Sequence, residues 1–218
     1  AAKPYQTYTY SIGGFALSSP DAYTPLMTVD SDYMGLKTAI SDPKDLEVDA
    51  DNNVYIADAK NNRIVVLDRY YKLKFTIETF VNEYGIDDEL TNPAGVFVTD
   101  DTIYVCDTDA NRIVTFDKEG NYQRIIPQPE RTLFDDDAVY KPVAVAVDQY
   151  GRIFVVSSTT YEGIIVMTSE GQLTGFIGAQ AVSLSAWQII WRRFQTDEQR
   201  ELSVTNVSTE FNNIAITE

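Results

Sequence analysis

The sequence contains no histidine. Histidine is the usual general base near neutral pH, a member of the Ser-His-Asp arrangement and a common zinc ligand, so its absence excludes these mechanisms and sites. No other pattern in the chain identifies a catalytic residue. The sequence therefore argues against an enzyme, and we assign no catalytic or cofactor-binding residue.

Cysteine and long apolar runs are also scarce. Cys106 is the single cysteine, which excludes an internal disulfide. It lies in an apolar stretch and is predicted to be a small core residue. Because the chain has no run of about 18 apolar residues, we expect no transmembrane segment.

Basic residues are few. Lys and Arg number 17 against 33 Asp and Glu, so the net charge is −16. A field of that sign repels nucleic-acid phosphates and anionic lipid headgroups, so we expect no nucleic-acid partner. Two interpretations of the acidity stay open, namely solubility and attraction of a cationic partner.

The sequence does contain a repeat. Asp58–Asp68 reads Asp-Ala-Lys-Asn-Asn-Arg-Ile-Val-Val-Leu-Asp, and Asp107–Asp117 reads Asp-Thr-Asp-Ala-Asn-Arg-Ile-Val-Thr-Phe-Asp, at a constant offset of 49. A third unit emerges from the flanks, because Pro43, Pro93 and Pro142 each open a similar apolar alternation. Repeats of this length indicate propellers or solenoids.

Within each unit the apolar residues alternate with a period of two, which predicts strands. In the first unit the predicted strands are Asp45–Val48, Val54–Ala57, Ile64–Leu67 and Leu73–Ile77, with polar turns between them. Four short antiparallel strands per unit make a propeller blade. The predicted fold is all-β, a β-propeller of four-stranded antiparallel blades, with about three blades and part of another.

These residues resemble the NHL-repeat β-propellers. The motif is a tyrosine-bearing strand that ends in Asp and is followed by Asn-Arg-Ile-Val, and it occurs at Tyr55–Val65 and Tyr104–Val114. The third unit has lost the Asp, the Asn and the Arg. The resemblance covers residues 42–180 and implies a six-bladed propeller of the TolB-like or gluconolactonase-like superfold, of which this chain would be an N-terminal portion.

We expect one incomplete propeller domain over residues 1–218. Three blades are too few for a six-bladed ring, which leaves three arrangements open: a fragment, a small fourth blade built from leading and trailing strands, or pairing of open blade edges between chains. The strand-like residues Tyr8–Tyr10 are a candidate for closing the ring. The predicted parts are blades at 42–80, 93–129 and 142–180, a helical insertion at 183–203 and the start of a further blade at 211–218.

Candidate ligand residues fall in the connections between blades. Trp187 and Trp191 recur at helical spacing in the insertion and either pack against a blade or form a partner-docking surface. The acidic runs in the 80s and 130s are either solvated loops or Ca²⁺ ligands of the kind that lactonase-like propellers use. The candidates for this face are Trp187, Trp191, Asp135, Asp136, Asp137, Asp87 and Asp88.

The repeated Asp and Arg are predicted to be structural, since an Asp that ends one strand can pair with an Arg that opens the next. The residues of this structural repeat motif are Asp58, Asn62, Arg63, Asp107, Asn111 and Arg112.

The expected function is that of a non-enzymatic binding module that recognises a carbohydrate, peptide or protein on the blade-connection face. The alternative is a Ca²⁺-dependent, lactonase-like hydrolase. The start, Ala1-Ala2-Lys3-Pro4-Tyr5, suits a mature N-terminus left after export, which favours an extracellular or cell-surface location, or else a trimmed start.

Overall fold

The computed structural model describes residues 7–20, 26–129, 139–159, 163–178 and 213–216. The chain divides into two compact units, Ala1–Ala39 and Ile40–Glu218. The helical insertion at 183–203, with Trp187 and Trp191, and the acidic residues Asp135–Asp137 lie outside the described residues. Residues 213–216 of the predicted further blade form neither helix nor strand.

The first unit holds a two-stranded antiparallel hairpin, β1 (Tyr8–Tyr10) and β2 (Ala16–Ser18), followed by the short helix α1 (Ser31–Met34). The side chain of Asp30 accepts a hydrogen bond from Tyr33 N at 2.8 Å and caps the start of α1. Gly35 ends α1 in the left-handed conformation, with φ 85°. The predicted closing strand, Tyr8–Tyr10, therefore pairs with β2 in its own unit.

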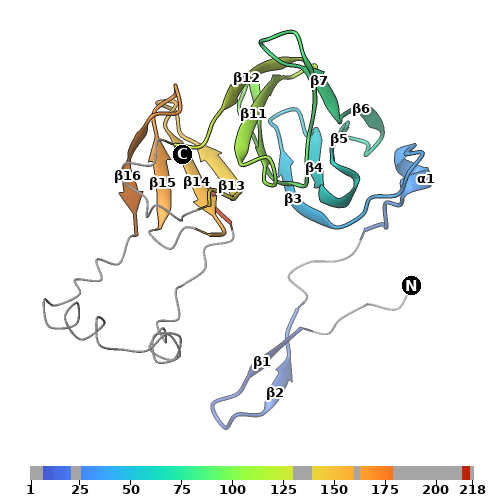
Figure 1. Cartoon of the computed structure of the whole chain (residues 1–218). Helices are drawn as coiled ribbons and strands as arrows, with labels where there is room; N and C mark the ends of the chain where they lie inside the picture. The colour runs from blue at the N-terminus through green and yellow to red at the C-terminus, as the bar shows by residue number, and fades with distance from the viewer. Residues whose placement is uncertain (1–6, 21–25, 130–138, 160–162, 179–212, 217–218) are drawn as a thin grey trace, which may run out of the picture. The chain divides into compact units, whose positions relative to one another are not determined.

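The second unit contains three four-stranded antiparallel sheets, which follow one another along the chain as blades 1, 2 and 3 (Figure 1). In each sheet the strands lie side by side in sequence order, as in a propeller blade. The predicted all-β propeller architecture is confirmed. Blade 1 is β3 (Pro43–Val48), β4 (Val54–Asp58), β5 (Arg63–Leu67) and β6 (Leu73–Ile77); blade 2 is β9 (Pro93–Val98), β10 (Thr102–Asp107), β11 (Arg112–Asp117) and β12 (Tyr122–Ile126); blade 3 is β13 (Pro142–Val147), β14 (Ile153–Ser157), β15 (Ile164–Met167) and β16 (Leu173–Ile177).

The core lies between blades rather than inside one. Tyr55 and Ile64 of blade 1 pack with Ile103 and Phe116 of blade 2, and a second cluster joins blades 2 and 3 around Cys106. Because side chains alternate along a strand, each sheet offers one apolar set to the preceding blade and one to the following blade. This arrangement explains why the middle strands have few polar positions.

The first strands of successive blades approach one another closely. Strand β3 contacts β9, and β9 contacts β13. At Gly95 a Cβ atom would lie 2.6 Å from the carbonyl oxygen of Val143 and 3.0 Å from the Cα of Ala144. Only glycine permits that approach of two backbones.

Four of the turns at one end of the blades are capped by an aspartate, and Thr99 and Thr168 take this place in the other two. Asp68 Oδ1 accepts hydrogen bonds from Tyr70 N at 2.8 Å and Lys72 N at 2.9 Å, and Asp117 caps the corresponding turn of blade 2 in the same way. Asp49 and Asp148 cap the first turns of blades 1 and 3. A carboxylate that bonds to its own backbone two and four residues on is typical of such turns.

The connection between blades 1 and 2 contains an element that was not predicted. Between blades 1 and 2 the chain forms a separate antiparallel hairpin of β7 (Thr79–Val81) and β8 (Asp87–Glu89), joined by a turn at residues 82–86. Strand β6 ends beside the Asp58–Arg63 loop, since Ile77 pairs with Ile64. The hairpin therefore starts at the end of the blades where the connections between blades lie, which is the blade-connection face. Asp87 and Asp88 are residues of this hairpin.

Candidate functional site

The loop between the two middle strands of blade 1 is organised by Asp58, whose side chain is fully buried. Its Oδ1 accepts a hydrogen bond from Ser41 N at 2.7 Å, and its Oδ2 accepts from Arg63 Nε at 2.7 Å and from Asn61 Nδ2 at 2.9 Å. One carboxylate thus ties the chain entering the blade to the loop and to β5. Charge-assisted bonds of this kind are short and strong.

Blade 2 repeats this geometry. Asp107 Oδ1 accepts from Thr91 N at 2.6 Å, and its Oδ2 accepts from Arg112 Nε at 2.8 Å. In blade 3 the same place is held by Ser157, whose Oγ accepts from Lys141 N at 3.0 Å. Because a neutral hydroxyl replaces the carboxylate there, blade 3 needs no arginine to balance a negative charge.

The asparagine of the motif connects successive blades. Asn62 adopts the left-handed conformation with φ 54°, and its Oδ1 accepts from Asn92 N at 2.9 Å. Asn111 has the same conformation, yet its buried Oδ1 has no hydrogen-bond partner within the described part of the chain. The equivalent donor, Lys141 N, is taken by Ser157 Oγ. Apart from the unpaired Asn111 Oδ1, the polar groups of this motif make their contacts within the protein framework.

Hairpin β7–β8 is anchored to this framework by one of its two sides. The guanidinium of Arg112 binds both oxygens of Asp88, Nη1 to Oδ2 at 2.7 Å and Nη2 to Oδ1 at 2.8 Å, and also donates to the carbonyl of Glu89. Opposite Asp88, the ring of Phe80 is buried between Tyr122 and Phe116. Leu90, just after the hairpin, is also buried.

The other side of the hairpin points away from the framework. Because residues alternate along β7 and β8, Thr79, Val81, Asp87 and Glu89 share this side, and all four are exposed. Tyr84 and Ile86 are exposed in the turn. The strands border an open groove of about 670 Å³, lined by Thr79, Phe80, Val81, Asp87, Asp88 and Glu89.

The first of the repeats matches a known family. The NHL repeat family model covers residues 41–67, from Ser41 through the Asp58–Arg63 pair to the end of β5. Residues 41–67 form an NHL repeat. The match and the three four-stranded blades confirm the predicted NHL-type propeller.

Comparison with solved structures gives matches at low identity, and comparison with curated proteins gives no match. Hydrazine synthase from Kuenenia stuttgartiensis is 14% identical with a TM-score of 0.49, and the likeness covers 66% of this chain and 38% of that one. A streptogramin B lyase is 18% identical (TM-score 0.45; 66% and 44% covered). Virginiamycin B lyase from Staphylococcus aureus is 16% identical (TM-score 0.42; 82% and 50% covered). The chain thus spans half or less of each of these structures.

Asp87 and Asp88, the two candidate site residues that the structure describes, lie on different sides of the hairpin. Asp88 points into the NHL framework and is paired with Arg112, whereas Asp87 lies on the exposed side of the hairpin. Among the described residues, no group of three or more acidic or cysteine side chains is placed to hold a metal ion. In the same part of the chain, no helix is long and apolar enough to cross a membrane.

Sequence reasoning missed Phe80 and the partnership of Asp88 with Arg112. Asp88 and Arg112 lie 24 positions apart, and no local sequence pattern connects their two regions of the chain. The one available signal was the apolar Thr79-Phe80-Val81 run after a complete blade, which indicates an additional strand.

Lowering the pH is expected to loosen the hairpin. The hydrogen bonds from Arg112 lower the pKa of Asp88 from 3.8 to about 2. A depressed carboxyl pKa stabilises the fold above the unfolded value, so this contribution is present above about pH 4 and is lost as the pH falls towards about 2. We expect a loss of about 1 kcal/mol, because Asp88 is partly solvated. Urea denaturation at a series of pH values from 6 to 2 measures this loss.

The control is Asp88→Asn, which should show a smaller loss of stability over the same pH interval. An identical pH dependence in the two proteins would contradict the assignment to Asp88.

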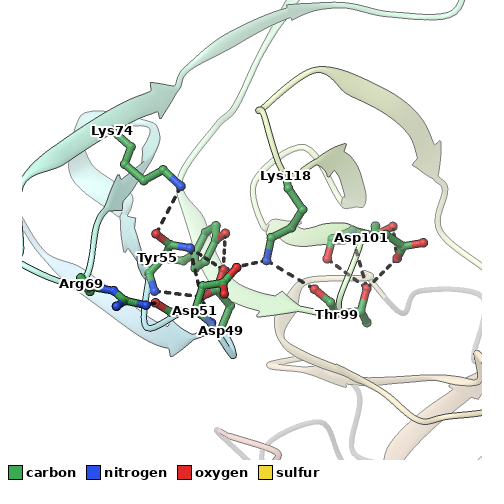
Figure 2. Close-up of polar contacts among 10 residues, drawn as sticks. Asp49, Asp51, Tyr55, Arg69, Lys74, Thr99, Asp101 and Lys118 are labelled. Atoms are coloured by element: carbon green, nitrogen blue, oxygen red, sulfur yellow. Dashed lines mark hydrogen bonds and ion pairs between the residues drawn. The ribbon is translucent and has the colours of Figure 1, made fainter.

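The opposite ends of blades 1 and 2 are joined by a second polar cluster. Figure 2 shows Lys118, from the last turn of blade 2, reaching Asp49 of blade 1, with Nζ 2.8 Å from Oδ2. Tyr55 Oη donates to the same Oδ2 at 3.0 Å, and Lys118 Nζ lies 5.1 Å from the Tyr55 ring centroid. Burial opposes ionisation of Asp49, but the hydrogen bonds from Lys118 and Asn53 hold its pKa well below the ordinary value.

Replacing Lys118 with Met should lower the free energy of unfolding by about 1.5–3 kcal/mol, because it removes a hydrogen bond to a nearly buried carboxylate. Lys44→Met is the matched control. Lys44 pairs with Asp42 at 3.0 Å with both side chains about half exposed, so its loss should cost about 0.5 kcal/mol or less. Equal costs for the two variants, measured by denaturant titration, would refute a structural role for the Lys118 contact.

Proposed function

We propose that the chain is a non-enzymatic binding module that holds a protein or peptide partner on the blade-connection face, with hairpin β7–β8 as the main contact. The observation that carries this proposal is the division of the hairpin into two sides. Phe80 and Asp88 fix one side to blade 2, and the other side presents Val81, Asp87 and Glu89 to solvent. A rigid, exposed surface of mixed apolar and acidic character loses little conformational entropy on binding.

A protein or peptide is favoured over a carbohydrate by the exposed apolar residues of the hairpin. Val81, Tyr84 and Ile86 are each more than half exposed. Apolar side chains gathered on a surface mark protein contacts more often than isolated ones do. The acidic neighbours Asp87 and Glu89 add attraction for a basic segment.

The Ca²⁺-dependent hydrolase is less well supported. A hard cation needs several oxygen ligands that are not already paired. On the described part of the connection face, Asp88 is held by Arg112, and Asp58 and Asp107 are held by their own arginines. Among the residues that the structure describes, Asp87 has no neighbouring carboxylates placed to complete a metal site.

The test uses the whole chain on an array of immobilised peptides and on an array of glycans. The variant replaces Val81, Tyr84 and Ile86 with Ser, and the control replaces Tyr150, an exposed residue in the first turn of blade 3, with Ser. We expect saturable peptide binding that the triple variant loses and the control keeps. Glycan binding alone, hairpin-independent binding, or a Ca²⁺-induced rise in melting temperature with hydrolysis of a simple lactone would overturn the proposal.

A further inference from the structure

The backbone of strand β7 has an inner edge that bonds to β8 and an outer edge that points away from it. Leu90 N donates to Glu78 O at 3.0 Å across the hairpin. Along an antiparallel ladder, residues that bond to the partner strand alternate with residues whose N–H and C=O groups point away from it. Phe80 therefore bonds to β8, whereas Thr79 and Val81 direct their N–H and C=O groups outward. We call these outward groups the β7 edge.

The two outer edges of the hairpin differ in what occupies them. On β8, Glu89 O accepts a hydrogen bond from Arg112 Nη2 at 3.0 Å, and Glu89 N donates to Asp88 Oδ1 at 2.8 Å. On β7, the outward groups of Thr79 and Val81 have no hydrogen-bond partner among the residues that the structure describes. A row of unpaired backbone groups is a template for one more strand.

The hairpin determines what such an added strand would meet. Its side chains would alternate between the two sides of the hairpin. The residues that bond to Thr79 and Val81 would share the exposed side with Asp87 and Glu89, beside the groove of about 670 Å³. The residue between them would lie opposite Phe80, on the side that faces blade 2.

The surroundings of the β7 edge are acidic. Residues 78–90 include no lysine or arginine, and their acidic members are Glu78, Glu83, Asp87, Asp88 and Glu89. Arg112 pairs with Asp88, whereas Asp87 and Glu89 are exposed. Two copies of this hairpin would repel each other, which disfavours pairing of β7 with β7 of a second copy. A strand with basic side chains is attracted instead.

We propose that the β7 edge takes up one extended strand of a partner protein or peptide, in which basic residues alternate with apolar ones. The basic residues bond through their backbone to Thr79 and Val81, and their side chains lie on the side of Asp87 and Glu89. The apolar residue between them packs beside Phe80. This inference rests on the proposed function, since it specifies the partner of the same hairpin. Main-chain hydrogen bonds supply affinity, and the alternating side chains supply selectivity.

Backbone methylation of a probe peptide tests the strand pairing directly. The probe is a short synthetic peptide in which Arg and Val alternate, made unmodified, methylated on every Arg backbone nitrogen, or methylated on every Val backbone nitrogen. In the proposed pairing the Arg N–H groups face β7 and the Val N–H groups face away. Titration calorimetry with the whole chain should show binding of the unmodified and Val-methylated peptides. The Arg-methylated peptide should bind about tenfold or more weakly, because its hydrogen bonds to β7 are removed.

Substitutions in the hairpin test the same pairing from the side of the protein. Val81→Pro removes an outward N–H and no hydrogen bond between β7 and β8, whereas the matched control Val81→Thr keeps this N–H. We expect an affinity about tenfold or more lower for Val81→Pro alone, with melting temperatures of both variants close to that of the wild-type chain. Asp87→Lys should lower the affinity and its salt dependence. Asp51→Lys, the same charge change on the first turn of blade 1, should alter neither.

The outcomes separate strand addition from the proposed function. Equal affinities of the two methylated peptides, with binding lost in the triple variant of the hairpin, would mean that side chains alone recognise the peptide. That result would overturn strand addition and keep the proposed function, whereas binding that survives in the triple variant would overturn both. If the unmodified peptide does not bind, strand addition is wrong, and the peptide array still decides the proposed function.

Amide hydrogen exchange identifies any other occupant of the β7 edge. The amides of Thr79 and Val81 should exchange rapidly in the free chain and become protected when the unmodified peptide is added. Protection in the free chain that rises with protein concentration would indicate a second copy on this edge. Protection that is independent of concentration would mean that the chain itself covers the edge. Either result would overturn the proposal.

Discussion

Replacing Asp58 with Ala is expected to lower the free energy of unfolding by about 3–5 kcal/mol, as measured by guanidinium chloride denaturation followed by far-ultraviolet circular dichroism. The substitution removes the acceptor of Ser41 N and leaves the nearly buried guanidinium of Arg63 without its 2.7 Å partner. A buried charge that loses its counter-ion is costly because the interior solvates it poorly.

Asp51→Ala is the matched control for this prediction. Asp51 is an exposed residue in the first turn of blade 1, and its substitution should change stability by less than about 0.5 kcal/mol. A cost for Asp58→Ala that is as small as that of the control would mean that the NHL carboxylate does not support the blade.

Replacing Phe80 with Ala is expected to cost about 3–5 kcal/mol, the usual range for deleting a buried aromatic ring. The ring stacks on Tyr122 with centroids 5.2 Å apart, meets Phe116 edge-on at 5.4 Å and lies 5.6 Å from the Arg112 guanidinium carbon. Its loss removes the apolar anchor of hairpin β7–β8. Amide hydrogen exchange should therefore show that protection falls most strongly in β7 and β8.

The control on the same hairpin is Tyr84→Ala. Tyr84 is 77% exposed, so its removal should leave both stability and amide protection nearly unchanged. If Phe80→Ala lost stability uniformly, with no larger effect in β7 and β8, the ring would be a general core residue and not the anchor of the hairpin.

Much of the framework followed from local sequence. The Asp-Asn-Arg-Ile-Val motif and the period-two alternation predicted strands and blades, because a strand between two sheets needs apolar residues on both faces. The Asp58–Arg63 and Asp107–Arg112 contacts are local, since the paired residues are only five positions apart in the chain. Contacts between residues so close in the chain can be predicted directly from the sequence.

The candidate site depended on contacts that span blades. Asp88 was predicted as a metal or partner residue from its acidic neighbours, yet Arg112 binds it from the next blade. Lys118 likewise finds Asp49 from 69 positions away. No periodicity connects such residues, because their approach depends on how one sheet packs on the next.

By itself, the sequence determined the repeat, the four-stranded blades and the absence of imidazole chemistry, since these depend on residue type and short-range spacing. Only the tertiary structure decided that residues 79–89 form a hairpin with one buried and one exposed side, and that Tyr122 and Arg112 of blade 2 cover the buried side. The physical reason is that burial of a side chain depends on the neighbouring blade, which short-range spacing does not specify.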